Sequence, residues 1–280
     1  MLGKSFSLGL IGDAMVGMMA GMVLLCSADR LASQTGSNGV KTLFVHVSPS
    51  TQKKTPVFRR TGASAVVYFS GMTIDADGAP NAYHPDDRPG LDALKNAGGD
   101  DKWWALVVGA DGKPVVQRSG EFKGYFLSMT WLTSEDDRYS RIDPEYWVDA
   151  RKVPYVAIPY SVLRATGIVK GDLAYVINGK TKKSSVAIVA DMGTENTLGE
   201  GSIALARAVG VKSCDPRVGG QEAGIAYVVF PRSAAQIRWP REMEEMQSAA
   251  AARFQEWGGE EALADLRRLT SASIRRRPRP

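Results

Sequence analysis

The chain has 280 residues, 44% of them hydrophobic and 23% charged, with a formal net charge of +5 at pH 7. This length allows one sizeable core with extensions or two small domains, and the composition is ordinary for a soluble globular protein. Two cysteines and two histidines, each pair far apart in sequence, provide neither a disulfide framework nor a zinc site, so we expect acid–base chemistry to rest on Asp and Glu.

The N-terminus has the pattern of a secretory signal. Lys4 precedes an apolar run over residues 6–25, which ends in the small residues Ser27 and Ala28. Asp13 interrupts the run and disfavours a membrane span, because a central charge costs about 2.5–3.5 kcal/mol on insertion scales. We therefore predict a signal peptide over residues 1–28, with a misassigned start or a buried helix as the alternatives, and a secreted or periplasmic protein.

After a polar linker over residues 29–41, the segment 42–231 is predicted to be the catalytic domain. Short runs rich in Val, Ile, Tyr and Phe, bounded by Gly, Pro, Asp and Asn, are typical of strands. They cover residues 42–47, 64–71, 103–109, 113–117, 125–132, 155–159, 173–177, 185–191 and 226–230. Asn178-Gly179 predicts a hairpin, and helical patterns are confined to residues 88–98 and 201–211. Many strands with few helices favour a β-barrel or a sandwich.

Two carboxylates near the end of this domain could form a catalytic pair. Asp191 ends a strand-like run, and Glu200 follows nine residues later, just before the predicted helix. Glycosidic cleavage needs one protonated acid for the leaving oxygen and one carboxylate to activate water or attack carbon. Taken alone, the two acids are equally consistent with an ordinary strand–turn–helix unit, since acids are favoured at helix starts.

Three motifs together resemble the family 75 chitosanases, best known from fungi: Ile74–Gly78 (I-D-A-D-G), residues 81–87 (N-A-Y-H-P-D-D), and D-M-G…G-E-G-S-I-A-L-A from Asp191 onwards. The similarity runs from about Ser64 to Phe230. It implies an endo-acting, inverting hydrolase of β-1,4-linked glucosamine polymers with Asp191 and Glu200 as its essential carboxylates. Fungal members usually carry Cys where this chain has Ala76, which suggests a bacterial-type branch.

The resemblance implies a substrate-binding role for further residues. Asp75 and Asp77 could bind the ammonium groups of chitosan through charge-assisted hydrogen bonds; the alternatives are an Asp-rich turn or a calcium loop. Trp104 is predicted to stack on a sugar face, although strand tryptophans are more often core residues. We predict no metal, no cofactor, no nucleic-acid partner and no stable membrane insertion, and assign no oligomeric state.

The residues alone leave the acid and base roles open. Glu200 beside a helix N-terminus would suit a base, because the helix dipole favours its ionised form. Asp191 at the end of an apolar strand would suit an acid, because desolvation raises a carboxyl pKa. Against this assignment, Glu is the commoner general acid among glycosidases.

The strand–loop–helix unit around Asp191 also resembles the core of double-psi β-barrels, which occur in expansin-like proteins, some endoglucanases and lytic transglycosylases. The predicted fold is therefore mainly β: a double-psi-like six-stranded β-barrel with extra strands and few short helices. An expansin-like, non-hydrolytic polysaccharide-binding protein is the alternative function, and the presence of both carboxylates favours the hydrolase. A non-enzymatic interaction protein acting through the C-terminal region is a third possibility.

The C-terminal region predicts a helical appendage over residues 232–270, packed on the barrel or pairing with a partner. Met243, Met246, Phe254 and Trp257 share one helical face, and three leucines align in a second short helix. Residues 271–280 are rich in arginine and predict a disordered tail. We expect activity to survive removal of residues after about 233.

Overall fold

The computed structural model describes residues 39–99, 102–236 and 239–275. The predicted signal peptide and most of the predicted linker lie outside these residues. The strands are β1 (Val40–Val47), β2 (Lys54–Arg60), β3 (Val66–Asp75), β4 (Gly98–Gly99), β5 (Lys102–Trp103), β6 (Tyr155–Ala157), β7 (Leu173–Asn178), β8 (Ser184–Asp191), β9 (Glu200–Ser202) and β10 (Gln221–Phe230). The helices are α1 (Tyr160–Thr166), α2 (Ile203–Ala208), α3 (Met243–Glu256) and α4 (Gly259–Arg275), with single 3-10 turns at Leu94–Asn96, Pro144–Tyr146 and Ser233–Gln236.

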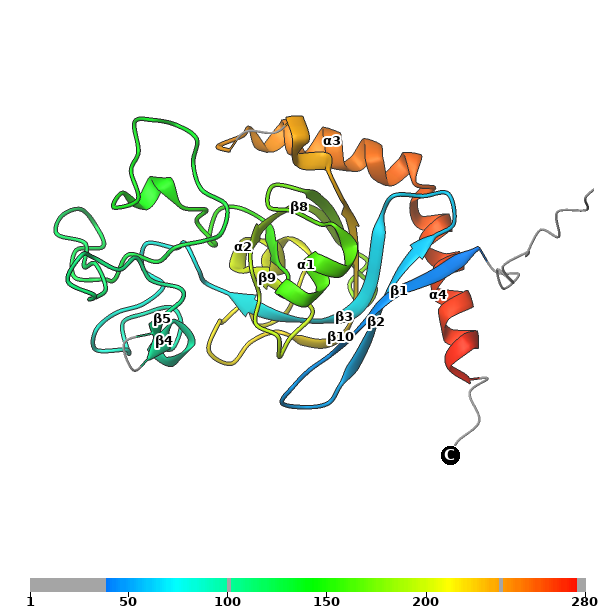
Figure 1. Ribbon diagram of the computed structural model, residues 1–280, viewed down its shortest axis with the longest axis horizontal. Coiled ribbons are helices and arrows are strands. Elements are labelled where there is room, and N and C mark those ends of the chain that lie inside the picture. Colours follow the sequence, from blue (N-terminus) through cyan, green and yellow to red (C-terminus); the bar gives the residue numbers. More distant parts are fainter. Residues whose placement is uncertain (1–38, 100–101, 237–238, 276–280) are drawn as a thin grey trace, which may run out of the picture. The chain divides into compact units, whose positions relative to one another are not determined.

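Six strands close into a barrel in the order β3-β10-β7-β8-β6-β9, because β9 pairs with β3 as well as with β6. The pairs β3–β9 and β6–β8 are parallel and the others antiparallel. The hairpin β1–β2 extends the sheet from β3, as Figure 1 shows. The prediction of a mainly β fold with a six-stranded barrel and extra strands is confirmed.

The barrel is filled by long apolar strands. β3, β8 and the second part of β10, from Ile225 to Phe230, are near-continuous runs of buried residues. This is the pattern of strands that are covered on both faces. Tyr68 and Tyr227, both fully buried, stack with ring centroids 4.6 Å apart. Such pairs contribute about 0.5–1.5 kcal/mol beyond the area they bury. The rigid barrel therefore provides a firm base for the side chains at its strand ends.

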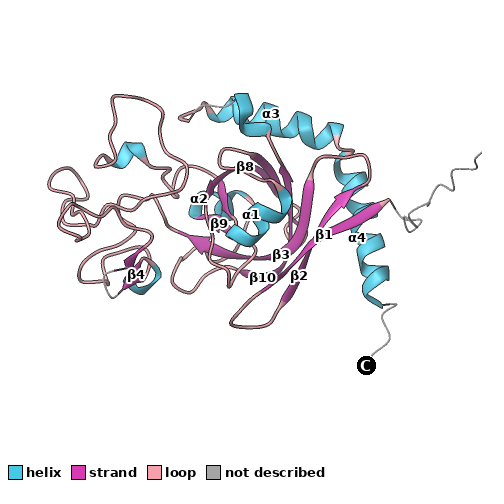
Figure 2. Ribbon diagram, viewed as in Figure 1, coloured by secondary structure: helices cyan, strands magenta, loops and turns pink. Residues whose placement is uncertain are grey.

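Residues 76–99 and 102–153 form mainly long loops on one side of the barrel, which Figure 2 draws in pink. Strands were predicted here over 103–109, 113–117 and 125–132, but apart from the two-residue β4–β5 pair the structure has isolated bridges such as Leu106↔Ser128 and Val108↔Pro114. Pro114 has no N–H to extend a ladder. The helix predicted over residues 88–98 is also wrong, because a single 3-10 turn forms in its place. Loops of this length are typical of binding and catalytic regions.

Helices α3 and α4 pack on the barrel as part of its core. Phe254 of α3 stacks on Tyr175 of β7 with ring centroids 4.2 Å apart, and the Arg60 guanidinium donates to the Trp257 carbonyl at 3.0 Å. In Figure 1, α3 lies across the barrel above β8. The two helices therefore share buried surface with the barrel, which argues against the expectation that they are dispensable. α4 continues to Arg275, into the segment predicted as a tail, because the first proline after it is Pro278.

None of the helices in the described part of the chain combines the length and apolar character needed to cross a bilayer.

Candidate active site

The short strand β6 positions the two predicted carboxylates. Ala157 pairs with Asp191 in the parallel neighbour β8 and with Glu200 in the antiparallel neighbour β9. Paired residues project from the same face of a sheet, so both side chains lie on one face with a single strand between them. Neighbouring strands are about 4.8 Å apart, which puts the two backbones roughly 10 Å from each other.

Strand β3 brings a third carboxylate to the same face. Its parallel pairing with β9 places Thr73 opposite Glu200, and Asp75 follows two residues later. Because strand side chains alternate with a period of two, Asp75 projects to the same face as Thr73 and Glu200. Asp75, Asp77 and Asp191 each have one carboxylate oxygen within 4.8 Å of the other two. The motif containing Asp75 and Asp77 thus meets the predicted catalytic aspartate.

The aspartates are held by hydrogen bonds from the surrounding loops. Asp191 Oδ1 accepts the backbone N–H of Trp131 at 3.1 Å and that of Met192 at 2.7 Å. Asp75 Oδ1 accepts the N–H of Asp77 at 2.8 Å, so the predicted Asp-rich turn is also present. These bonds fix the two carboxylates and favour their ionised forms.

Glu200 has a different environment. Among the described residues, no hydrogen bond to its carboxylate is found, and its Oε2 lies 2.8 Å from the position a Cβ would occupy on Gly193. Gly193 therefore leaves the space that this carboxylate fills. Glu200 belongs to β9 rather than to the first turn of α2, whose N-cap is Ser202, so the helix-dipole argument for an ionised Glu200 does not apply.

Burial and crowding raise the pKa values of all four carboxyl groups. Asp75 is 7% exposed, and desolvation raises its pKa to about 6. Desolvation, then the charges of Asp75 and Asp191, raise the pKa of Asp77 well above its usual value. The pKa of Asp191 is raised well above the usual range by burial and then by Asp75, against the two backbone bonds that lower it. Burial, followed by Asp75 and Asp191, likewise raises the pKa of Glu200. Groups poised in this way are typical of acid–base sites.

A cavity of about 320 Å³ opens above these groups, within the usual size range of ligand sites. Trp104 is at its edge, 59% exposed, and its indole N–H donates to the Asn96 carbonyl at 2.8 Å. An exposed, fixed indole can stack on a sugar ring. The structure therefore brings all five residues singled out from the sequence to one place, with Asp75, Asp77, Glu200 and Trp104 lining the cavity and Asp191 against Asp75.

Further residues of the site were not singled out as site residues from the sequence. The Tyr83 hydroxyl donates to Asp77 Oδ1 at 2.7 Å, and the Tyr155 hydroxyl donates to the Asp77 carbonyl at 3.0 Å. Asp92 lines the cavity and accepts the Asn96 side-chain amide at 2.9 Å. Tyr83 could have been identified from the sequence, because it lies within the N-A-Y-H-P-D-D motif. No sequence motif marks Asp92 or Tyr155 as residues of the site.

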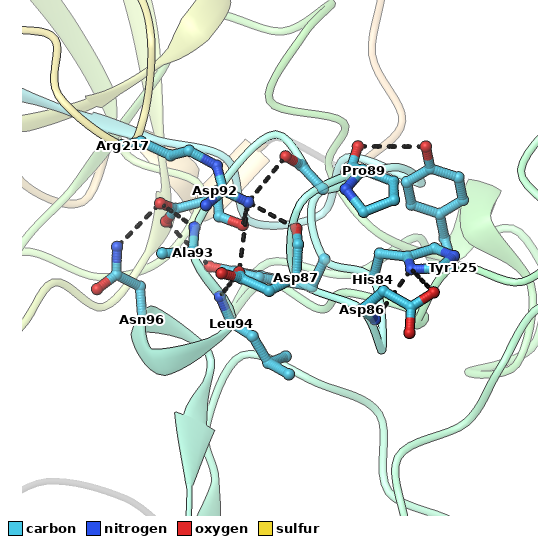
Figure 3. A network of polar contacts seen from close by, with 12 residues as sticks. His84, Asp86, Asp87, Pro89, Asp92, Ala93, Leu94, Asn96, Tyr125 and Arg217 are labelled. Atoms are coloured by element: carbon cyan, nitrogen blue, oxygen red, sulfur yellow. Dashed lines mark hydrogen bonds and ion pairs between the residues drawn. The ribbon is translucent and has the colours of Figure 1, made fainter.

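Arg217 ties down the loop that carries Asp92. Its Nη2 group donates to the carbonyl oxygens of Asp87, Gly90 and Asp92 at 2.6, 3.1 and 2.9 Å, and lies 3.3 Å from the Asp87 carboxylate. Figure 3 shows Arg217 reaching across to this loop, with Asn96 beside Asp92. One guanidinium thus connects the segment before β10 to the loop that walls the cavity.

The three aspartates form the only group with metal-ligand spacing in the described part of the chain. Ca²⁺ takes six to eight oxygen ligands, and Asp75, Asp77 and Asp191 each already accept a hydrogen bond. The arrangement fits charged hydrogen-bond partners such as ammonium groups at least as well as it fits a metal ion.

Comparison with known proteins assigns the family. A family model described as fungal chitosanase of glycosyl hydrolase group 75 matches residues 108–260, and a comparison with curated proteins found no match. The matched segment contains Asp191 and Glu200 and reaches into α4, whereas the motif at Asp75 and Asp77, part of the predicted resemblance, lies before it. The chain belongs to the fungal-type chitosanases of glycosyl hydrolase group 75, and it is a glycoside hydrolase that acts on a polysaccharide.

Proposed function

We propose that the protein is an endo-acting, inverting chitosanase in which Asp191 and Glu200 are the catalytic carboxylates. The observation that carries this proposal is the pairing of both residues with Ala157 on the two sides of β6. Inverting enzymes hold their carboxyl groups about 6.5–9.5 Å apart, whereas retaining enzymes hold them about 5–5.5 Å apart. Backbones separated by one intervening strand suit the wider spacing and leave room for a water molecule.

Glu200 is the general acid in this proposal. Its pKa is raised by burial and by the neighbouring carboxylates, and no hydrogen bond within the described residues stabilises its charge. Its protonated form is therefore favoured, and Glu200 can transfer that proton to the glycosidic oxygen as the C–O bond breaks.

Asp191 is the general base. Two backbone N–H groups stabilise its charge. A substrate ammonium group bound beside Asp75 would counteract the rise that burial and Asp75 give to the pKa of Asp191, because an opposite charge favours the ionised form. Asp191 then takes a proton from the water that attacks the anomeric carbon from the opposite side. The overall balance is one water consumed and one glycosidic bond broken, with inverted configuration at that carbon.

Asp75 and Asp77 bind substrate ammonium groups in this proposal, and Trp104 stacks on a sugar ring. Cations are attracted to a cavity whose carboxylates crowd one another, since each ion pair relieves that repulsion. This charge distribution supports chitosan over neutral polymers such as cellulose. Because the substrate is an external polymer and the N-terminus has the pattern of a signal peptide, we propose that the protein is secreted or periplasmic.

The test is a reducing-end assay on chitosan, chitin, peptidoglycan glycan and cellulose in parallel. We expect cleavage of chitosan, falling by several orders of magnitude in Glu200→Gln and Asp191→Asn without any loss of thermal stability. Proton NMR of the fresh products should show the inverted anomer first. Near wild-type turnover in either variant, or initial retention of configuration, would contradict the mechanism. Binding without cleavage would instead indicate the expansin-like alternative.

A further inference from the structure

A cavity of about 590 Å³ lies at the other end of β3 from the proposed catalytic carboxylates. It is formed where β2 and β10 end and β3 begins, and residues at the C-terminal end of α3 also line it. From here β3 runs for ten residues before it reaches Asp75, which is about 30 Å along an extended strand. The two cavities have no lining residue in common. This cavity, called the arginine pocket below, is therefore separate from the catalytic one.

The arginine pocket is basic, in contrast to the catalytic cavity. Three arginines line it, Arg60, Arg232 and Arg253, against a single acid, Glu256, so the formal charge of its lining is +2. The catalytic cavity is lined by four acids and one base. A cationic pocket attracts anions and repels the ammonium groups of chitosan. The arginine pocket is therefore suited to a ligand of the opposite charge to the proposed substrate.

Two of these guanidinium groups are held in place with most of their donors unused. Arg60 donates to the Trp257 carbonyl at 3.0 Å and lies 5.7 Å from the centroid of the Trp257 ring, and Arg253 donates to the Ala249 carbonyl at 3.3 Å. Among the described residues these are the only hydrogen bonds of the two side chains, although a guanidinium has five N–H donors. The indole N–H of Trp257, whose side chain also lines the pocket, has no acceptor among the described residues. The lining thus offers fixed donors in excess of acceptors.

The third arginine, Arg232, has a strained backbone. Its φ is +66°, a left-handed conformation that is uncommon for a residue with a side chain and that glycine adopts without a Cβ penalty. The turn is fixed by the fully buried Asp172 carboxylate, which accepts the Ala234 N–H at 2.9 Å. Residues held in such conformations cluster at functional sites. Stability alone would favour glycine here, so the presence of arginine supports a role for its guanidinium.

We propose that the arginine pocket binds a small ligand with more than one phosphate or carboxylate group. Planar guanidinium groups match both kinds of oxyanion, which accept two parallel N–H bonds from one arginine. Three arginines around a cavity of about 590 Å³, within the usual size range of small-molecule sites, suit a multivalent anion better than a single one. The bound anion would connect α3 to the ends of β2 and β10. The inference concerns a site outside the catalytic cavity and does not depend on the proposed chitosanase function.

The experiment titrates the full chain with inorganic phosphate, pyrophosphate and citrate, by calorimetry and by thermal unfolding, at an ionic strength held constant with sodium chloride. We expect saturable binding of pyrophosphate and citrate that is tighter than that of phosphate. Tm should rise with the concentration of each ligand, because binding to the folded state alone stabilises it. Absence of saturable binding for all three anions, or a Tm rise that sodium chloride reproduces at the same ionic strength, would overturn the inference.

Three variants locate the binding. Arg232→Gly removes one guanidinium and relieves the backbone strain, so the Kd for pyrophosphate should rise roughly two- to fivefold, the range given by an exposed charge pair, without loss of Tm in the absence of ligand. Glu256→Gln removes the one acid of the pocket and should lower the Kd by a similar factor. Arg118→Gln removes an exposed arginine that does not line the pocket and should leave the Kd unchanged. An equal rise in Arg118→Gln and Arg232→Gly, or an unchanged Kd in both pocket variants, would place the binding elsewhere and overturn the inference.

Discussion

Gly193→Ala is expected to slow the enzyme while leaving its fold intact. A Cβ added at Gly193 would lie 2.8 Å from Glu200 Oε2 and 3.4 Å from the Ala157 carbonyl group. The backbone of Gly193 is not among those with a positive φ, so alanine meets no conformational strain there. The carboxylate of Glu200 is the group that has to move.

The size of the effect follows from the distances. Moving Oε2 from 2.8 Å to an ordinary contact near 3.4 Å displaces the proposed acid by about half an ångström. Because a misplacement of about 1 Å can cost on the order of 10²-fold in rate, we expect kcat on chitosan to fall roughly tenfold, with KM changed less. The free energy of unfolding should change by less than about 1 kcal/mol, since the atom that yields ends a side chain.

The assay compares kcat, KM and thermal unfolding of Gly193→Ala with those of Gly99→Ala. At Gly99 an added Cβ meets no atom of the described residues within 4 Å, and φ is not positive, so that variant controls for the substitution itself. Wild-type kcat in Gly193→Ala would refute the reasoning that places the proton donor against Gly193. A fall in kcat accompanied by an equal fall in stability would assign the loss to folding instead.

Three further variants test other parts of the structure. Tyr83→Phe removes the hydroxyl that donates to Asp77 at 2.7 Å; the pKa of that carboxyl should rise further, and KM for chitosan in a pH series should increase most on the acidic side. Asp75→Asn should raise Tm more at pH 8 than at pH 4. The pKa of Asp75 in the folded protein is about 6, above the usual 3.8, so the protonated carboxyl stabilises the fold at low pH and this stability is lost as pH rises through 6. Asparagine stays neutral and avoids that loss. The rise of the Asp75 pKa from 3.8 to about 6 corresponds to about 3 kcal/mol of folding free energy. Equal Tm shifts at both pH values would contradict this prediction. Phe254→Ala should cost about 3–5 kcal/mol of unfolding free energy, because its buried ring fills the contact with Tyr175; a loss below 1 kcal/mol in denaturant titration would show that α3 is peripheral.

The barrel was predictable because its signals are local. The runs that became β3, β8 and β10 are short, apolar and bounded by turn residues, so composition alone identifies them as buried strands. The loops over residues 103–132 have the same composition but form single bridges. A segment becomes a strand of the barrel only if a partner strand continues alongside it. That depends on residues far away in sequence, so it cannot be predicted from the composition of a short segment.

The residues of the candidate site were predictable from the sequence, but their spacing and roles were not. The nine-position separation of Asp191 and Glu200 and the resemblance to a family suggested the pair. The strand that separates them, β6, is three residues long and lies far away in sequence, so the spacing of the two side chains could not be derived. The roles were also out of reach, because they depend on which carboxylate receives backbone N–H groups.

The position of β3 explains why the match to residues 108–260 cannot be the whole catalytic unit. β3 lies between β9 and β10 and closes the barrel, and its last residue is Asp75, which contacts Asp191 in the cavity. A chain reduced to the matched segment would leave both neighbours of β3 as open edges and would expose Tyr227, which stacks on Tyr68. It would also lack the β1–β2 hairpin that extends the sheet from β3. Residues 39–99 and 102–107 therefore supply the strand that closes the barrel and an aspartate that lies beside Asp191.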